Sequence, residues 1–309
     1  MDVMLHGDET IAMEKHAAVY YVQKGYRVFV LNRNTRPQPE GVTLIEGDRH
    51  EPGDKLKSYH FDAILDITAY TAKDIDCLLD AVGSYDDYVL ISSGAVYSER
   101  SPLPFSEQTP LIPNRFWGTY GTDKAAAEEA LLKRDPNAYI LRPPYLYGPM
   151  NNVYRESFVF ECALQNRKFY LPGDGQMKLQ FFHIHDLCRF MDIILDKKPA
   201  RHIFNVGNAE VISVRDWVAL CYQTAGKDVE FVSVNSGIEQ RNYFSFYNYE
   251  YQLDVAEQIK LMPGTKSLEE GLKEAFAWYI EHPGLVNRKN YIDYIDANLV
   301  PGGGLCQTS

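Results

Sequence analysis

The sequence has few cysteines and no long apolar run. Its 309 residues include five cysteines, which are widely spaced and form no CxxC pair. A disulfide framework or a cysteine-rich zinc site needs clustered cysteines, so we expect free thiols in a reducing compartment. No apolar stretch approaches the roughly 20 residues that span a membrane. The acid-containing N-terminus is unlike a secretory signal, and we expect a cytoplasmic protein without a membrane segment.

Basic residues are also in the minority. Lys and Arg number 31 against 42 Asp and Glu, which gives a formal net charge of −11. Nucleic-acid binding normally needs a basic stripe facing the phosphates, so we expect no nucleic-acid partner. A few local arginines can still hold the phosphate of a small-molecule substrate within an acidic protein.

Short apolar runs alternate with helical patterns along the first half of the chain. Strands separated by helices and short turns predict an α/β fold with a parallel, doubly wound, Rossmann-like sheet. The predicted strands are Val3–His6, Tyr26–Leu31, Val42–Ile45, Asp62–Ile67, Tyr88–Ser92 and Tyr139–Arg142, and the predicted helices are Ala12–Lys24, Lys73–Val82 and Lys124–Lys133.

The pattern is looser after residue 150. It predicts helices at Glu156–Asn166, from Asp186 and from Val214, the last capped by Ser213, and a strand at His202–Val206. We expect a dinucleotide-binding domain over residues 1–150 and a smaller substrate-binding region over 151–290, interwoven with the first. Residues 291–309 form a tail, whose glycine-rich end we expect to be disordered.

Two short motifs fit one catalytic mechanism. ISSGAVY, which contains Ser93, directly follows a strand pattern, and YGTDK, which runs from Tyr120 to Lys124, opens an alanine-rich helix. Residues four apart lie on one helix face, so Lys124 can place its ammonium beside Tyr120 and lower the phenol pKa from about 10. Tyr120 would then act as acid or base near neutral pH, and Ser93, at the carboxyl end of a strand, would hold the substrate oxygen.

Each motif alone is weak, but together with other motifs in the same order they carry a family resemblance. Over residues 1 to about 280 the chain resembles the extended short-chain dehydrogenase/reductases, the NAD-dependent epimerases and dehydratases acting on nucleotide sugars. The other motifs are Glu46-Gly47-Asp48, FSEQTP from Phe105, LRPPYLYGP from Leu141, FHIHDL from Phe182, FNVG from Phe204 and SLEEGL from Ser267. Leu31–Asp48 and Phe61–Tyr70 look closest to an atypical branch, which includes bacterial proteins of unassigned substrate and chloroplast RNA-binding relatives.

The resemblance implies roles for individual residues. Ser93, Tyr120 and Lys124 take the catalytic positions, Lys124 also binds the nicotinamide ribose, and Asp48 contacts the adenine. The backbone around Pro143 lies beside the nicotinamide. The residues expected to bind the cofactor NAD(P) are Gly7, Thr10, Asn32, Arg33, Asp48, Ser92, Tyr120, Lys124 and Pro143. The resemblance also implies a small-molecule substrate, such as a nucleotide sugar, and a homodimer.

The glycine loop of the family is degenerate in this chain. A Rossmann first turn needs glycines so that the backbone can approach the pyrophosphate, but only Gly7 remains. Asp8, Glu9 and Glu14 stand at or beside the other glycine positions, and each carboxylate would repel a phosphate by about 1 kcal/mol in water at ~4 Å. A cofactor-free member of the family, acting as a binding or regulatory module, is therefore the alternative to an enzyme.

The end of the second strand favours NADP over NAD. An NAD site usually has an acid here to hold the ribose diol, whereas this chain has Asn32, followed by Arg33 and Arg36. Either arginine could accept a 2′-phosphate.

Dehydratases of the superfamily usually carry an Asp-Glu pair directly after the catalytic Ser or Thr. Gly94 and Ala95 occupy these positions here. An epimerase or a reductase is therefore expected, rather than that sort of dehydratase.

Three further groups have both functional and structural interpretations. His183 and His185 could bind a metal, but no other ligand cluster accompanies them, so we expect packing and no metal. The aromatic stretch 243–251 could line a pocket or stack a base, or form a half-buried strand or loop. By the resemblance, three arginines lie where relatives bind substrate phosphates, namely Arg155, Arg167 and Arg241, although surface ion pairing is also open for each.

Overall fold

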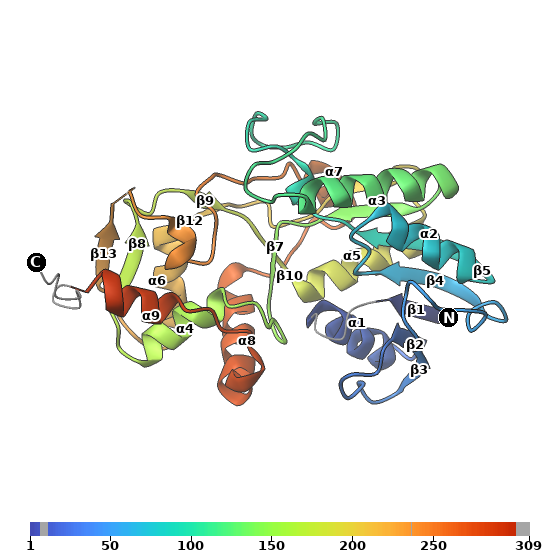
Figure 1. The fold of residues 1–309 in the computed structure, drawn as a ribbon, viewed down its shortest axis with the longest axis horizontal. Coiled ribbons are helices and arrows are strands. Elements are labelled where there is room, and N and C mark those ends of the chain that lie inside the picture. The colour runs from blue at the N-terminus through green and yellow to red at the C-terminus, as the bar shows by residue number, and fades with distance from the viewer. Residues whose placement is uncertain (7–11, 236, 301–309) are drawn as a thin grey trace, which may run out of the picture.

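The computed structural model describes residues 1–6, 12–235 and 237–300. Two lobes lie side by side, one built around a large sheet and the other around helices and short strands (Figure 1). Residues 7–11 of the predicted acidic glycine loop and the predicted disordered end, residues 301–309, fall outside the described residues. No helix in the described ranges has the length and apolar character needed to cross a bilayer.

The sheet lobe contains seven parallel strands in the order β11-β6-β5-β4-β1-β2-β3. Its strands are β1 (Asp2–His6), β2 (Arg27–Asn32), β3 (Val42–Glu46), β4 (His60–Asp66), β5 (Ser84–Ile91), β6 (Tyr139–Arg142) and β11 (Ile203–Asn205). The chain winds outward in both directions from the middle of the sheet. This reversal leaves a crevice at the carboxyl ends of β1 and β4, where open α/β sheets bind ligands. The predicted doubly wound fold is confirmed.

Helices cover both faces of the sheet. α1 (Ala12–Gln23) and α5 (Ile184–Lys197) pack on one face, and α2 (Ala72–Ala81) and α3 (Tyr120–Arg134) pack on the other. Successive residues of a strand face opposite sides. Val3 and Leu5 of β1 accordingly join the core under α1 and α5, whereas Met4 joins the core under α2 and α3.

The second lobe has a largely aromatic core. Its helices are α4 (Glu156–Leu164), α6 (Val214–Thr224), α8 (Leu268–Glu281) and α9 (Tyr291–Asn298). Its short strands pair as β7 (Tyr145–Tyr147) with β10 (Phe181–His183), β8 (Phe169–Pro172) with β13 (Phe231–Val234), and β9 (Lys178–Leu179) with β12 (Ile212–Ser213). The remaining helix, α7 (Ala256–Leu261), contacts β11. The Ser213 hydroxyl accepts from the backbone N–H of Asp216 at 3.0 Å, as the predicted cap requires.

Residues beyond 150 contribute to both lobes. The chain builds α4 and β8 in the second lobe, returns to the sheet lobe as α5 and β11, and then leaves again for α6. The sequence did not predict β8 or β13. The aromatic stretch 243–251 contains no strand and packs largely in the core of the second lobe. Four cysteines of the described ranges are free thiols, namely Cys77, Cys162, Cys188 and Cys221.

Candidate active site

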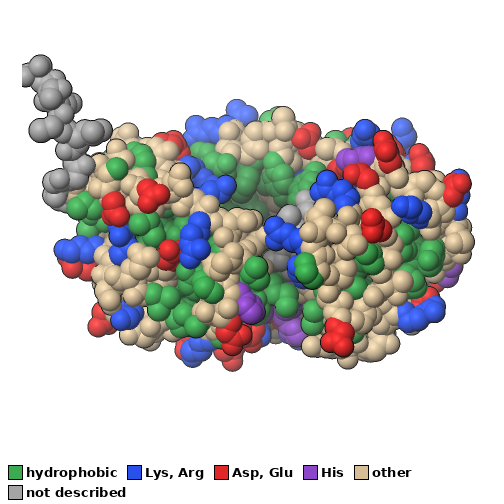
Figure 2. All heavy atoms as spheres, turned by 60° about the horizontal axis from the view of Figure 1, so that its bottom comes forward, with side chains coloured by type: hydrophobic (Ala, Val, Ile, Leu, Met, Phe, Trp, Pro, Cys, Tyr) green, Lys and Arg blue, Asp and Glu red, His purple; other side chains and the backbone are tan. Residues whose placement is uncertain are grey.

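A cavity of about 380 Å³ lies at the carboxyl ends of β5 and β6. Ser93, Tyr120, Lys124 and Pro143 all line it, so the structure brings the predicted catalytic residues together. Figure 2 shows that the surface is hollowed where the two lobes meet, with apolar side chains and cations around the hollow.

Ser93 is held at the end of a buried strand. β5 ends at Ile91, and the next backbone amides are fixed to the neighbouring β6 segment. Ser92 N–H donates to the Leu141 carbonyl at 2.8 Å, and Gly94 N–H donates to the Pro143 carbonyl at 2.9 Å. The Ser93 hydroxyl accepts from Ala95 N–H at 3.1 Å and so caps a short 3₁₀ helix, Gly94–Val96.

Tyr120 reaches this strand end because α3 packs unusually close to it. A Cβ atom on Gly121 would lie only 2.3 Å from the Ala95 carbonyl oxygen, so only glycine permits this approach. The first turn of α3 thereby places Tyr120 and Lys124 on the wall of the cavity that also holds Ser93.

The electrostatic state of Tyr120 differs from the prediction. Burial raises the pKa of its phenol, while an interaction with the Ser93 hydroxyl and the positive charge of Arg155 act in the opposite direction. The expected lowering of the Tyr120 pKa by Lys124 is not found. Arg155, which directly precedes α4, is the cation that acts on this phenol.

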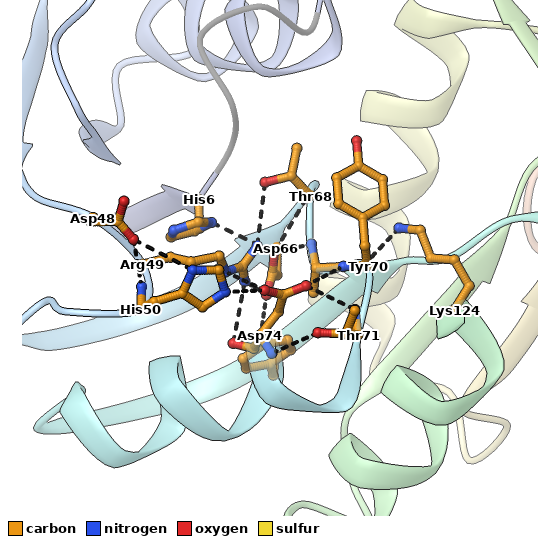
Figure 3. Close-up of polar contacts among 12 residues, drawn as sticks. His6, Asp48, Arg49, His50, Asp66, Thr68, Tyr70, Thr71, Asp74 and Lys124 are labelled. Atoms are coloured by element: carbon orange, nitrogen blue, oxygen red, sulfur yellow. Dashed lines mark hydrogen bonds and ion pairs between the residues drawn. The ribbon is translucent and has the colours of Figure 1, made fainter. Parts of the chain in front are cut away.

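Lys124 is directed toward the sheet instead. Its ammonium donates to the carbonyls of Ala69 at 2.8 Å and Ile91 at 2.9 Å, beyond the carboxyl end of β4 and at that of β5. It also lies 4.7 Å from the centre of the Tyr70 ring (Figure 3). Its side chain is fully buried, and burial lowers the pKa of Lys124 to about 8.

A second cavity of about 210 Å³ lies at the carboxyl ends of β1, β2 and β4. Three of the predicted cofactor residues line it, namely Asn32, Arg33 and Asp48. Tyr70 lines both cavities, so the two are neighbours along the same edge of the sheet. Two other predicted cofactor residues, Gly7 and Thr10, lie outside the described residues.

An ionic network surrounds this second cavity (Figure 3). Arg49 donates to Asp66 at 2.8 Å and its Nε lies 3.7 Å from Asp74, while His50 Nε2 lies 2.7 Å from the same Asp74. His6 Nδ1 is buried 3.8 Å from Asp66 and has no hydrogen-bond partner among the described residues. The sequence did not predict this network. Its one local signal is Asp66, a carboxylate directly after the apolar run of β4.

Glu14 does not line either of these cavities. Its carboxylate is buried and accepts from Asn32 Nδ2 at 3.2 Å, at the end of β2. Asn32 also donates to Gln38 at 3.0 Å. This carboxylate therefore binds the strand that follows α1. The other two acids of the expected loop, Asp8 and Glu9, lie outside the described residues.

Ser92 and Arg142 belong to a buried structural network. The Ser92 hydroxyl donates to Glu128 of α3, and Arg142 Nε donates to the same carboxylate at 2.9 Å. Arg142 also donates to the Tyr97 hydroxyl at 2.8 Å. Ser92 lines the catalytic cavity, as predicted for a cofactor-binding residue, but its hydroxyl is already bonded to α3.

The histidine pair and two of the three arginines have structural partners. His183 Nδ1 accepts from the backbone N–H of His185 at 3.2 Å and caps α5. In the described ranges, the one group of three or more His, Cys, Asp or Glu close enough to share a metal comprises His60, Asp62 and Asp86.

Arg167 pairs with Asp296, and Arg241 donates to the Ser245 carbonyl.

The two cavities have the chemistry that a dinucleotide needs. The smaller one offers amide, carboxylate and guanidinium groups together with the His6 imidazole, which suits an adenosine. The larger one offers an ammonium beside an apolar wall, which suits a ribose and a nicotinamide. The residues present therefore fit NAD(P), with Asn32, Arg33 and Asp48 at one end and Lys124 and Pro143 at the other.

A Rossmann-like sheet whose edge joins these two cavities defines a doubly wound α/β protein. Residues 15–207 match the profile of the NAD dependent epimerase/dehydratase family. The chain belongs to this family, which confirms the resemblance.

Individual relatives are distant. A chloroplast stem-loop binding protein of 41 kDa from Arabidopsis thaliana is 26% identical over 247 residues, which cover 76% of this chain and 64% of that protein. The chain thus matches less than two thirds of that relative. Two solved structures, each with a TM-score of 0.72, are similar in fold. A dTDP-glucose 4,6-dehydratase from Bacillus anthracis in complex with NAD is 19% identical, with 93% of this chain and 98% of that chain covered. A UDP-glucuronic acid 4-epimerase from Bacillus cereus in complex with NAD is 18% identical, with 91% and 99% covered.

Proposed function

We propose that the chain is an NAD(P)-dependent epimerase or reductase acting on a hydroxylated substrate such as a nucleotide sugar. The observation that carries this proposal is the convergence of Ser93, Tyr120 and Lys124 on one cavity at the carboxyl edge of the sheet. Membership of the epimerase/dehydratase family and the NAD-bound structural neighbours support the same function.

Each residue has one task in this proposal. Tyr120 removes the proton from a substrate hydroxyl, or returns it, because its phenol faces the cavity. Ser93 holds the substrate oxygen through its hydroxyl, which is fixed by its bond from Ala95 N–H. Lys124 binds the ribose hydroxyls of the cofactor, and Arg155 is the cation that acts on the phenol. When bound, the nicotinamide accepts or returns a hydride.

The packing around Gly94 supports an epimerase or reductase over a dehydratase. The dehydratase acid would stand at this position, but a Cβ atom here would lie 1.9 Å from the Tyr251 hydroxyl oxygen. Tyr251 is fully buried, so no carboxylate can be accommodated beside Ser93 without moving it.

Dinucleotide titration tests the proposal. NADH and NADPH are added separately to the purified chain and nicotinamide fluorescence is followed. We expect binding of at least one, and tighter binding of NADPH if Arg33 holds a 2′-phosphate. Absence of binding up to about 1 mM, a concentration at which even weak sites fill, would refute the proposal and favour a cofactor-free binding module.

Replacement of Tyr120 tests the chemistry. Tyr120→Phe keeps the ring but removes the proton-transfer group, so dinucleotide affinity should stay within about twofold while turnover falls at least ~100-fold. Turnover is measured on a panel of UDP- and dTDP-linked sugars by nicotinamide absorbance and product chromatography. Tyr26→Phe, at the opposite edge of the sheet, is the matched control. Retained turnover in Tyr120→Phe would remove this residue from its role.

The homodimer also stays a prediction, which light scattering would test.

A further inference from the structure

Six aromatic side chains in the described part of the chain line the catalytic cavity, namely Tyr70, Trp117, Tyr120, Tyr145, Tyr147 and Tyr251. The last three are buried in the core of the second lobe, so most of the ring surface that a ligand can reach belongs to the first three. Tyr70 lies against the Lys124 ammonium, and Tyr120 is the proposed acid or base. Trp117 has neither of these roles.

Trp117 lies directly beside the proposed acid or base. It precedes Tyr120 by three residues, and the Tyr120 N–H donates to the Trp117 carbonyl at 3.0 Å in the turn that leads into α3. The centres of the two rings are 5.8 Å apart. A ligand group in contact with the indole would therefore also lie close to the phenol.

The indole is held in one orientation by a distant segment of the chain. Its Nε1–H donates to the Tyr249 hydroxyl at 2.5 Å, and its ring lies edge-on to Tyr247, with 4.9 Å between the ring centres. The adjacent Phe116 stacks on Tyr249 at 4.6 Å. Both tyrosines belong to the aromatic stretch 243–251. They are not among the described residues that line the cavity, so their contribution there is to fix Trp117.

A fixed indole offers the cavity only its ring. Its single polar group, the Nε1–H, is already bonded to Tyr249, so Trp117 has no donor left for a ligand. The side chain is half-buried, which leaves part of the ring accessible. The face of an aromatic ring packs well against another ring or a flat apolar surface. Such a wall selects a ligand by its shape.

We propose that Trp117 packs against a ring of the substrate, so that the site selects ring-bearing alcohols or ketones over open-chain ones. This inference rests on the proposed function, because it places the ring beside Tyr120. The apolar face of a sugar ring and an aromatic ring both have the required flat surface. Because the indole is held before a ligand arrives, little conformational freedom is lost on binding. Trp117 is thus a specificity-determining residue, and Tyr249 positions it.

Matched ligands test the preference for a ring. CDP-glucose and CDP-ribitol carry a sugar ring and an open chain on the same nucleotide. Acetophenone, cyclohexyl methyl ketone and octan-2-one are methyl ketones with equal numbers of carbon atoms, and they carry an aromatic ring, a saturated ring and an open chain. Binding is measured by calorimetry, with and without saturating NADP+. In at least one set, we expect a ring-bearing member to bind at least about threefold more tightly than the open-chain member, as one aromatic contact predicts.

The two sets also identify the ring. A preference confined to the nucleotide pair indicates a sugar ring, whereas a preference for acetophenone over both other ketones indicates an aromatic ring. Equal binding within both sets, or no binding of any ring-bearing member up to about 10 mM, would overturn the inference. If a dinucleotide binds and turnover requires Tyr120 but no ring preference exists, this inference alone fails.

Variants assign the preference to Trp117. Trp117→Leu should reduce it to less than about 1.5-fold while changing the open-chain affinity less than about twofold, and Trp117→Phe should keep part of it. Trp278→Leu removes an indole from α8, outside the described lining of the cavity, and should leave the preference intact. A preference that survives Trp117→Leu would overturn the inference.

Tyr249→Phe tests the positioning of the indole. It keeps the ring that stacks on Phe116 but removes the acceptor of the indole N–H. The ring preference should fall toward that of Trp117→Leu, while the open-chain affinity stays within about twofold of the wild-type value. An unchanged ring preference in Tyr249→Phe would remove Tyr249 from this role.

Discussion

Lys124 connects the catalytic cavity to the edge of the sheet. Its ammonium is bonded to two strand-end carbonyls and lies against the Tyr70 ring, which also lines the second cavity. The ammonium has three N–H donors, so one remains for a cofactor ribose while both of these bonds are kept. Its charge is then the part of the site most sensitive to pH, since burial lowers its pKa to about 8.

This pKa predicts the pH dependence of cofactor binding. Below pH 8 Lys124 is charged and can donate from an ammonium, whereas above it the neutral amine predominates, so NADH affinity should fall as the pH rises from 8 to 10. NADH is preferred to NADPH as the probe because it lacks the 2′-phosphate, which titrates separately. Fluorescence titrations across this range give the dissociation constants.

Arginine stays charged over the whole range, so Lys124→Arg should bind NADH with a nearly pH-independent affinity. Lys133→Arg, an exposed change near the end of α3, should keep the fall seen in the wild type. If Lys124→Arg shows the same fall as the wild type, another group is responsible for it.

The sequence predicted the residues of the catalytic cavity better than their interactions. Ser93, Tyr120 and Lys124 lie in local motifs. They come together because these motifs lie at the carboxyl edge of the parallel sheet. The Arg155 charge on Tyr120 and the contact of Arg49 with Asp66 join segments that pair only in the folded chain. No local spacing reports such contacts.

At the scale of elements, the close approach of two backbones around Ser93 shapes the site. The 3₁₀ turn at Gly94–Val96 is enclosed by α3 on one side and by Tyr251 on the other, and both contacts need a residue without a side chain. The helix-forming residues run from Lys124, and the YGTDK motif predicted that the helix opens at Tyr120. The structure confirms this start, where Gly121 packs against Ala95.

Gly94→Ala tests whether this packing holds Ser93 in place. The added methyl would overlap the Tyr251 hydroxyl, and overpacking of this kind costs about 1–3 kcal/mol of unfolding free energy. We expect this loss in chemical denaturation, together with reduced turnover. Gly264→Ala has no atom within 4 Å of its added Cβ and should change stability by less than about 0.5 kcal/mol.

A second substitution separates crowding from other effects of Gly94→Ala. Tyr251→Phe removes the oxygen that the new methyl would meet, so the double variant should regain part of the lost stability. No recovery in the double variant would show that the Tyr251 contact is not the cause.

At the scale of the whole molecule, the two lobes share one chain path rather than two separable domains. Strands and helices of the first half were predicted to within a few residues because each has its own periodicity. The pairs β7 with β10 and β8 with β13 were beyond prediction, because each joins segments tens of residues apart and has no local signal. The same long-range pairing returns α5 and β11 to the first sheet.

This path predicts that residues 1–150 alone will not fold. Without α5 the apolar face of β1 loses its cover by Leu187 and Met191, and without β11 the edge of β6 is unpaired. Such a fragment should bind the dye ANS and unfold without a cooperative transition in circular dichroism. By contrast, residues 1–148 joined through a short glycine linker to residues 184–207 should recover a cooperative transition. The junction is short because Tyr147 pairs with His183 in adjacent parallel strands. If residues 1–150 unfold as cooperatively as the joined chain, α5 and β11 are not required for the sheet lobe to fold.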